Sequence, residues 1–145
     1  MPEQQIVINA PAEKVFNYVA DISKHGEWGQ PSQKLQVEKT SEGPIGKGST
    51  FKSTGRQFGT QNDTVTITEY VPNEKVVYES QGKAGHIRHA FQLSPSGSGT
   101  EVTKSFDVVK AGFPFALFLP MAKAFIIPGA LSSDLQRIKA KLEGS

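Results

Sequence analysis

The middle of the chain, from residue 35 to residue 109, consists of short β-branched segments separated by turn residues. The segments cover residues 35–39, 49–55, 62–71, 76–80, 86–93 and 101–109. Glycine, proline and serine clusters separate them, as in the Ser-Pro-Ser-Gly-Ser-Gly stretch at residues 94–99, and no helical periodicity intervenes. Because parallel strands need long crossover connections, this spacing predicts an antiparallel meander.

Helical patterns precede this strand-rich region. A β-branched run at residues 6–8 is followed by Pro11, which a first helical turn tolerates, and by Glu13, whose charge suits the helix dipole there. Apolar side chains then recur with helical spacing at Ala12, Val15, Phe16 and Val19. A second short helix is expected after Asp21, ending near Gly26.

The C-terminal part of the chain returns to helix. Its apolar residues are spaced i, i+4, i+7 and i+11, at Leu131, Leu135, Ile138 and Leu142. Four charged residues are expected on other faces of this amphipathic helix, namely Asp134, Arg137, Lys139 and Lys141. One strand, two short helices, about six strands and a long terminal helix together predict a single α+β domain over residues 1–145.

Composition excludes several classes of protein. The chain has no cysteine, which excludes a disulfide framework, thiol catalysis and cysteine-bound metal. Its 16 basic and 14 acidic residues are scattered, whereas a nucleic-acid-binding protein concentrates its basic residues on one face. The N-terminus lacks the basic and long apolar regions of a secretory signal, so we expect a cytoplasmic protein.

Two apparent motifs fail on inspection. The Gly-Pro-Ile-Gly-Lys-Gly-Ser-Thr segment at residues 43–50 is not a phosphate-binding loop, because a glycine separates the lysine from the serine and a strand follows. His86 and His89 are three residues apart, a spacing that directs two side chains to opposite faces of a strand. His25 is distant in sequence, and we expect no metal site and no cofactor.

Two stretches resemble the START-like (SRPBCC) superfamily. Residues 8–16 read Ile-Asn-Ala-Pro-Ala-Glu-Lys-Val-Phe, followed by Asp21 and Trp28, and residues 91–93 and 99–103 resemble a hairpin that reads Gly-Thr-x-Val in that superfamily. The group includes polyketide cyclase/dehydrase-like proteins, plant pathogenesis-related allergens and lipid-transfer domains. The resemblance implies a helix-grip fold, in which a curved antiparallel sheet wraps around the long C-terminal helix and an apolar cavity lies between them.

Residues 111–130 depart from the superfamily pattern by being more apolar. They contain Pro114, Pro120, Pro128 and Lys123, which argues against a transmembrane helix of about 20 apolar residues. Two interpretations remain open: helix core packed on the sheet, or an apolar lid, kinked near Pro120 and Pro128, past which a ligand enters. An exposed part of the segment would contact a membrane surface or a partner protein.

Strand alternation selects residues that face the expected cavity. It places Ile87, His89, Phe91 and Leu93 on one face, and it groups Lys104 with Val102, Phe106 and Val108. Lys104 is anomalous there, so we expect it near the open end of the sheet or turned outward by a bulge. The expected ligand-binding residues are Trp28, Phe51, Tyr78, His89, Phe91, Phe106, Phe113, Leu117, Phe118 and Met121.

His89 and Tyr78 are the candidate catalytic or orienting groups. A neutral histidine can bind a ligand carbonyl or act as a base near neutral pH. The alternatives are a structural strand histidine for His89 and a core tyrosine for Tyr78. Trp28 either lines the cavity or packs the short helices against the sheet.

Three functions are compatible with this pattern, since a fold does not by itself select one. The first is binding or transport of a small hydrophobic ligand, such as a lipid, a polyketide or an aromatic metabolite. The second is a cyclase or dehydratase acting on a polyketide-like substrate, and the third is a stress-related module that contacts a membrane or partner through residues 113–127. Several polar side chains converging inside the cavity would favour the enzyme, and one isolated histidine would favour binding.

Overall fold

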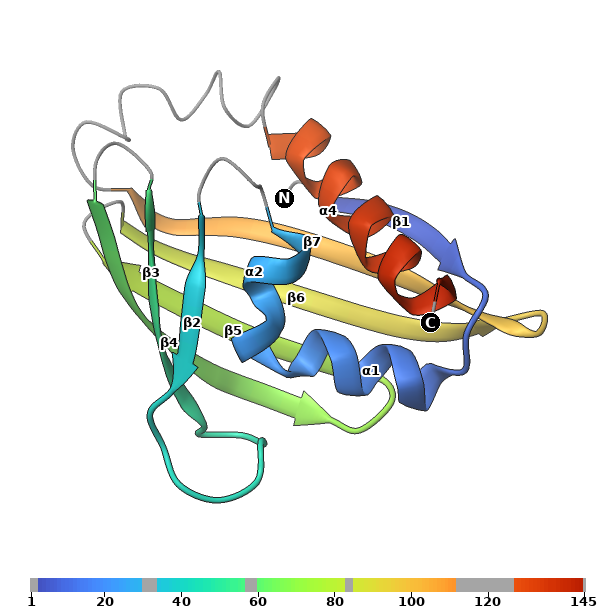
Figure 1. Cartoon of the computed structure of the whole chain (residues 1–145), viewed down its shortest axis with the longest axis horizontal. Coiled ribbons are helices and arrows are strands. Elements are labelled where there is room, and N and C mark those ends of the chain that lie inside the picture. Colours follow the sequence, from blue (N-terminus) through green and yellow to red (C-terminus); the bar gives the residue numbers. More distant parts are fainter. Residues whose placement is uncertain (1–2, 30–33, 57–59, 83–84, 112–126, 145) are drawn as a thin grey trace.

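The computed structural model describes residues 3–29, 34–56, 60–82, 85–111 and 127–144, and these form a seven-stranded antiparallel sheet with helices on one face (Figure 1). The strand order is β1-β7-β6-β5-β4-β3-β2, so the predicted meander from β2 to β7 is confirmed. The strands are β1 (Glu3–Ile8), β2 (Gln36–Lys39), β3 (Thr50–Arg56), β4 (Thr60–Val71), β5 (Lys75–Gly82), β6 (Gly85–Ser96) and β7 (Gly99–Ala111).

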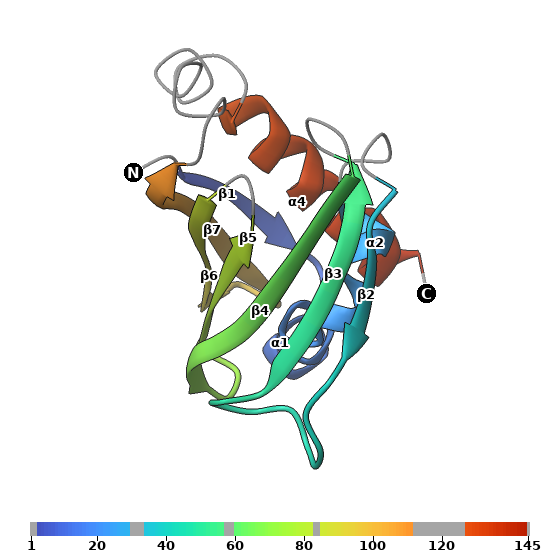
Figure 2. The same cartoon turned by 90° about the vertical axis from the view of Figure 1, so that its left-hand side faces the viewer.

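The helices occupy the concave face of this sheet. They are α1 (Ala12–Ala20), the 3₁₀ turn η1 (Ile22–Lys24), α2 (His25–Trp28) and the C-terminal α4 (Ile127–Glu143). Figure 2 shows the strands curving around α1 and α4. The helix-grip architecture, with two short helices after the first strand, is therefore confirmed.

The two stretches that carried the sequence resemblance meet in space. The Thr100 hydroxyl donates a 2.8 Å hydrogen bond to the Ala10 carbonyl and is fully buried. At Gly99, a β-carbon would lie 2.5 Å from the Ile8 carbonyl oxygen, so any side chain there would clash with backbone. The Gly-Thr pair thus lets the β6–β7 hairpin pack closely against the end of β1.

The core is built from the predicted apolar faces. Helix α1 contributes Val15, Phe16 and Val19, and α4 contributes Leu135, Ile138 and Leu142. On β6, burial alternates as predicted, with Ile87, His89, Phe91 and Leu93 facing the helices. This parity determines which side chains of the sheet face the helices.

Pro128 is the second residue of α4 as described, because residues 112–126 lie outside the described part of the chain. The kinks expected near Pro120 and Pro128 therefore stay predictions. None of the helices in the described ranges is long and apolar enough to cross a membrane.

Two phenylalanines on neighbouring strands provide a test of this packing. Phe91 is completely buried, whereas Phe106 is only partly buried and packs beside Ile127 and Leu131. We expect Phe91→Ala to lower the free energy of unfolding by about 3–5 kcal/mol, and Phe106→Ala by clearly less. Urea denaturation followed by circular dichroism measures both, and equal losses would contradict the assigned burial.

Candidate ligand site between the sheet and helix α4

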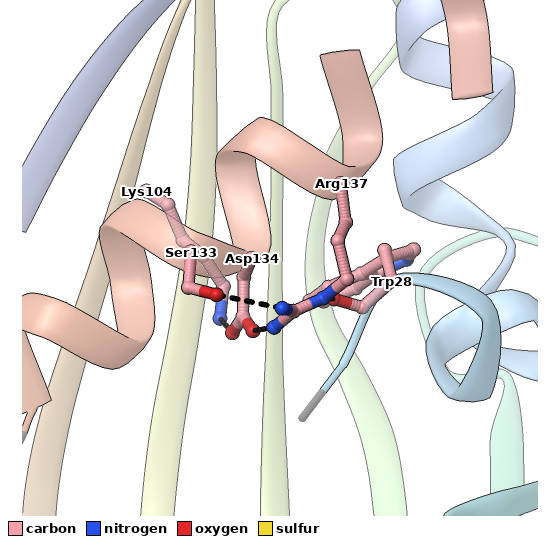
Figure 3. A network of polar contacts seen from close by, with 5 residues as sticks. All are labelled: Trp28, Lys104, Ser133, Asp134 and Arg137. Carbon is pink, nitrogen blue, oxygen red and sulfur yellow. Dashed lines mark hydrogen bonds and ion pairs between the residues drawn. The ribbon is translucent and has the colours of Figure 1, made fainter. Parts of the chain in front are cut away.

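A buried ion pair connects the sheet to the C-terminal helix. Lys104 on β7 is 2% exposed, and its Nζ lies 3.4 Å from Oδ2 of Asp134 on α4, itself 6% exposed (Figure 3). Both sequence expectations for these residues are wrong: Lys104 is neither at an open end nor turned outward, and Asp134 faces the sheet. The two charges lie inside because each compensates the other.

Arg137 extends this pair to the short helix α2. Its Nη2 donates to Asp134 Oδ1 at 2.7 Å, and its Nη1 donates to Ser133 Oγ at 2.6 Å. Its Nε donates to the backbone carbonyl of Trp28 at 2.7 Å. Figure 3 shows the resulting chain of contacts from β7 through α4 to the end of α2. The polar network therefore positions Trp28 relative to the sheet.

Aromatic rings enclose the Lys104 ammonium group. Its Nζ lies 5.0 Å from the centroid of the Trp28 ring and 5.6 Å from that of Phe91. The two rings are themselves in edge-to-face contact, with their centroids 5.5 Å apart. Such contacts stabilise a cation that has lost its hydration.

Two histidines and a tyrosine complete the cluster. Tyr78 and His89 are register partners on β5 and β6, and their rings stack at 4.8 Å. The His25 ring, from α2, stacks on Trp28 at 4.2 Å and lies 6.2 Å from the His89 ring. The structure thus brings together three polar aromatic side chains from three elements.

Three polar atoms in this region have no hydrogen-bond partner among the described residues. They are Trp28 Nε1, the Tyr78 hydroxyl and His89 Nδ1, all of them buried. Leaving such a group unsatisfied costs about 1–3 kcal/mol, so buried polar atoms are normally paired. Three such atoms around one ion pair are therefore expected at a site where a bound ligand supplies the missing partners.

Burial sets the protonation states of the cluster. Burial and then the Lys104 charge lower the pKa of His25 to about 3, and the same two causes, with His25, hold the pKa of His89 well below its usual range. Burial and Asp134 raise the pKa of Tyr78. Burial lowers the pKa of Lys104, while Asp134 opposes that shift. At neutral pH the site contains neutral imidazoles and a neutral phenol.

Most of the predicted site residues that the structure describes lie in or beside this cluster. Phe106 contacts the His89 ring edge-to-face at 5.1 Å, while Phe51 on β3 is buried in the main hydrophobic core. The others in the cluster are Trp28, Tyr78, His89 and Phe91. Four predicted residues lie outside the described ranges: Phe113, Leu117, Phe118 and Met121. Ligand contact by any of them stays a prediction.

Sequence reasoning missed His25, Asp134 and Arg137. His25 lies three residues before Trp28, so a single helical turn places both rings on one face. Asp134 lies i+3 from Leu131 and just before Leu135, which is the spacing of the apolar face itself. That spacing indicated that Asp134 faces the core. It did not indicate a buried ion pair, because the sequence does not show which residue is the partner.

The outer face of the sheet carries a separate polar group. His86 contacts Glu79 there, and Arg88 lies 3.7 Å from the same carboxylate. His86 and His89 therefore point to opposite faces, as their spacing predicted. Within the described part of the chain, no group of three histidine, aspartate or glutamate side chains could hold a metal ion.

Comparison with known proteins identifies relatives of the chain. The model of the family described as "Polyketide cyclase / dehydrase and lipid transport" matches residues 3–143. No curated protein matches.

Solved structures share the fold at low sequence identity. A protein from Chromobacterium violaceum is 19% identical with a TM-score of 0.70, over 97% of this chain and 96% of its own. A protein from Thermus thermophilus is 14% identical with a TM-score of 0.76, over 99% and 97%. The di-domain ARO/CYC protein StfQ from the steffimycin biosynthetic pathway is 13% identical with a TM-score of 0.73, over 98% of this chain and 50% of its own.

The buried ion pair yields a prediction for stability. Asp134→Ala leaves the Lys104 ammonium group buried without its carboxylate, and we expect a loss of about 3–5 kcal/mol in the free energy of unfolding. The double variant Lys104→Met with Asp134→Leu should recover most of this loss, because two apolar side chains need no charge partner. Urea denaturation of both variants and the wild type gives the comparison.

Asp107→Ala serves as the matched control. Asp107 forms a surface ion pair with Arg88 at 3.7 Å, and removing such a pair should cost less than about 1 kcal/mol. If Asp134→Ala were no more destabilising than Asp107→Ala, the Lys104–Asp134 pair would not be a buried structural contact.

Proposed function

This chain belongs to the polyketide cyclase/dehydrase and lipid transport family, and we propose that it binds a small, largely apolar, aromatic or polyketide-like molecule between the sheet and α4. The observation that carries the proposal is the cluster of buried polar atoms on Trp28, Tyr78 and His89 that have no hydrogen-bond partner in the described part of the chain. Binding sites for small molecules combine mostly apolar walls with a few polar groups that fix orientation.

The wall residues favour a flat, unsaturated ligand. Phe91, Phe106 and Trp28 present ring faces and edges, and such rings prefer offset or edge-to-face contact with another ring. Burial of the ligand's apolar surface would drive affinity at roughly 25 cal/mol per Å², before the costs of ordering the complex. The polar groups of Tyr78 and His89 would then orient oxygen atoms on the ligand.

Two measurements test binding. We expect native mass spectrometry of the purified protein, with organic extraction, to reveal a bound apolar molecule. Titration of ligand-free protein with 2-acetonaphthone should also quench the fluorescence of Trp28, which is the only tryptophan of the chain and lies in the site. A mass equal to that of the polypeptide, together with no binding of 2-acetonaphthone or a naphthalene acid, would contradict the proposal.

A second function is favoured by the convergence of several polar side chains. His25, Tyr78, His89 and Lys104 come together here, which meets the criterion that distinguishes an enzyme from a binding protein with one isolated histidine. We propose a cyclase or dehydratase reaction, and the fold shared with the ARO/CYC protein StfQ is consistent with that class.

The proposed chemistry begins with proton transfer. Neutral His89 removes a proton from a carbon next to a ligand carbonyl, and the electron pair moves onto the carbonyl oxygen. Hydrogen bonds from Tyr78 and Lys104 stabilise this enolate oxygen. The enolate carbon then bonds to a second carbonyl carbon, and the oxygen of that carbonyl takes the proton back from His89 to become a hydroxyl. The hydroxyl leaves as water together with the remaining hydrogen of the former enolate carbon, which forms a carbon–carbon double bond.

Deuterium exchange tests the proton-transfer step without the natural substrate. In D₂O, the protein should accelerate exchange of the methyl protons of 2-acetonaphthone, measured by proton NMR. His89→Gln should reduce this acceleration by at least about 100-fold, the usual contribution of a general base, with the affinity for 2-acetonaphthone nearly unchanged. His86→Gln, on the outer face, is the control and should retain the acceleration; retention in His89→Gln would remove His89 from the mechanism.

A further inference from the structure

The charges within the site do not cancel. Lys104 and Arg137 are positive, and Asp134 is the carboxylate that contacts both of them in the described part of the chain. The neighbouring His25 and His89 are neutral, for the reasons given above. The residues outside the described ranges include no aspartate or glutamate, so their side chains cannot supply a second carboxylate. One positive charge is left in excess.

The distances from Asp134 to the two cations show which of them is less well compensated. Asp134 lies 2.7 Å from Arg137 but 3.4 Å from Lys104, so Arg137 makes the stronger contact. Arg137 also donates to Ser133 and to the Trp28 carbonyl. Lys104 has three N–H donors, and among the described residues its side chain donates one long hydrogen bond, to Asp134. Lys104 is therefore the group that gains most from a further acceptor.

Two neighbouring groups offer further hydrogen-bond donors. Trp28 Nε1 can only donate, and the Tyr78 hydroxyl has a proton to donate, yet neither has a partner among the described residues. The Tyr78 ring lies 6.5 Å from both the His25 ring and the Phe91 ring, so this hydroxyl belongs to the same cluster as the ammonium group. A ligand that complements this cluster must bring acceptor oxygens.

We infer that the site selects acidic ligands: aromatic or cyclic molecules whose carboxylate, or ionised acidic hydroxyl, lies against Lys104 with Tyr78 and Trp28 as further donors. The inference deepens the proposed binding function and rests on it. An anion here cancels the excess charge, and hydrogen bonds that involve an ion are roughly twice as strong as neutral ones. The apolar part of the ligand contacts the rings of Trp28 and Phe91.

A matched pair of probes isolates the anionic oxygen. 2-Naphthoate and 2-acetonaphthone share one ring system and differ in carrying a carboxylate or a neutral methyl ketone. By isothermal titration calorimetry at neutral pH, we expect the acid to bind at least about tenfold more tightly than the ketone. Lys104→Met should abolish this preference while the ketone still binds, and Lys52→Met, at an exposed position on β3, should leave it intact.

Tyr78→Phe provides a variant that keeps the ion pair intact. It removes a single buried hydroxyl, and we expect it to weaken 2-naphthoate binding about threefold to tenfold and the ketone by less, because a hydrogen bond to a carboxylate is stronger than one to a neutral carbonyl. Equal affinity of the wild type for the two probes would overturn the inference and leave the binding proposal standing. Failure of both probes, and of benzoate and 9-anthroate as smaller and larger acids, would overturn both.

Discussion

The contact between Lys104 of β7 and Asp134 of α4 is the interaction on which the arrangement of the interior depends. A charge this deeply buried is costly unless an opposite charge accompanies it, so the lysine requires α4 to present Asp134 toward the sheet. Arg137, one turn further along the same helix, pairs with Asp134 and donates a hydrogen bond to the Trp28 carbonyl. One network thus couples sheet, terminal helix and short helix.

This network also determines the chemistry available between the layers. Burial, and after it the Lys104 charge, lowers the pKa of His25 and of His89, so both imidazoles are neutral at neutral pH. The aromatic rings around Lys104 replace part of its lost hydration, and they offer a flat ligand the contacts it needs. A site that holds a cation among ring faces can recognise both the apolar body and the oxygen atoms of a ligand.

Much of the fold could be predicted from residue patterns. The inward parity of His89 and Phe91 followed from the two-residue period of a strand, and the apolar face of α4 followed from the spacing of Leu131 and Leu135. The site was predicted less completely. Strand alternation placed Lys104 on the inward face, but we expected it near the open end of the sheet or turned outward. The reason is that the sequence shows no partner for a single lysine on an apolar face.

The sequence alone determined the order of elements, the faces that each element buries, and membership of an antiparallel sheet-and-helix class, because these depend on local periodicity and turn chemistry. Only the tertiary structure decided which polar residues meet. Thirty residues separate Lys104 from Asp134, and His25 comes from a four-residue helix far from His89 in sequence. No local pattern encodes such pairings, since they arise when the curved sheet brings β5, β6 and β7 against α2 and α4.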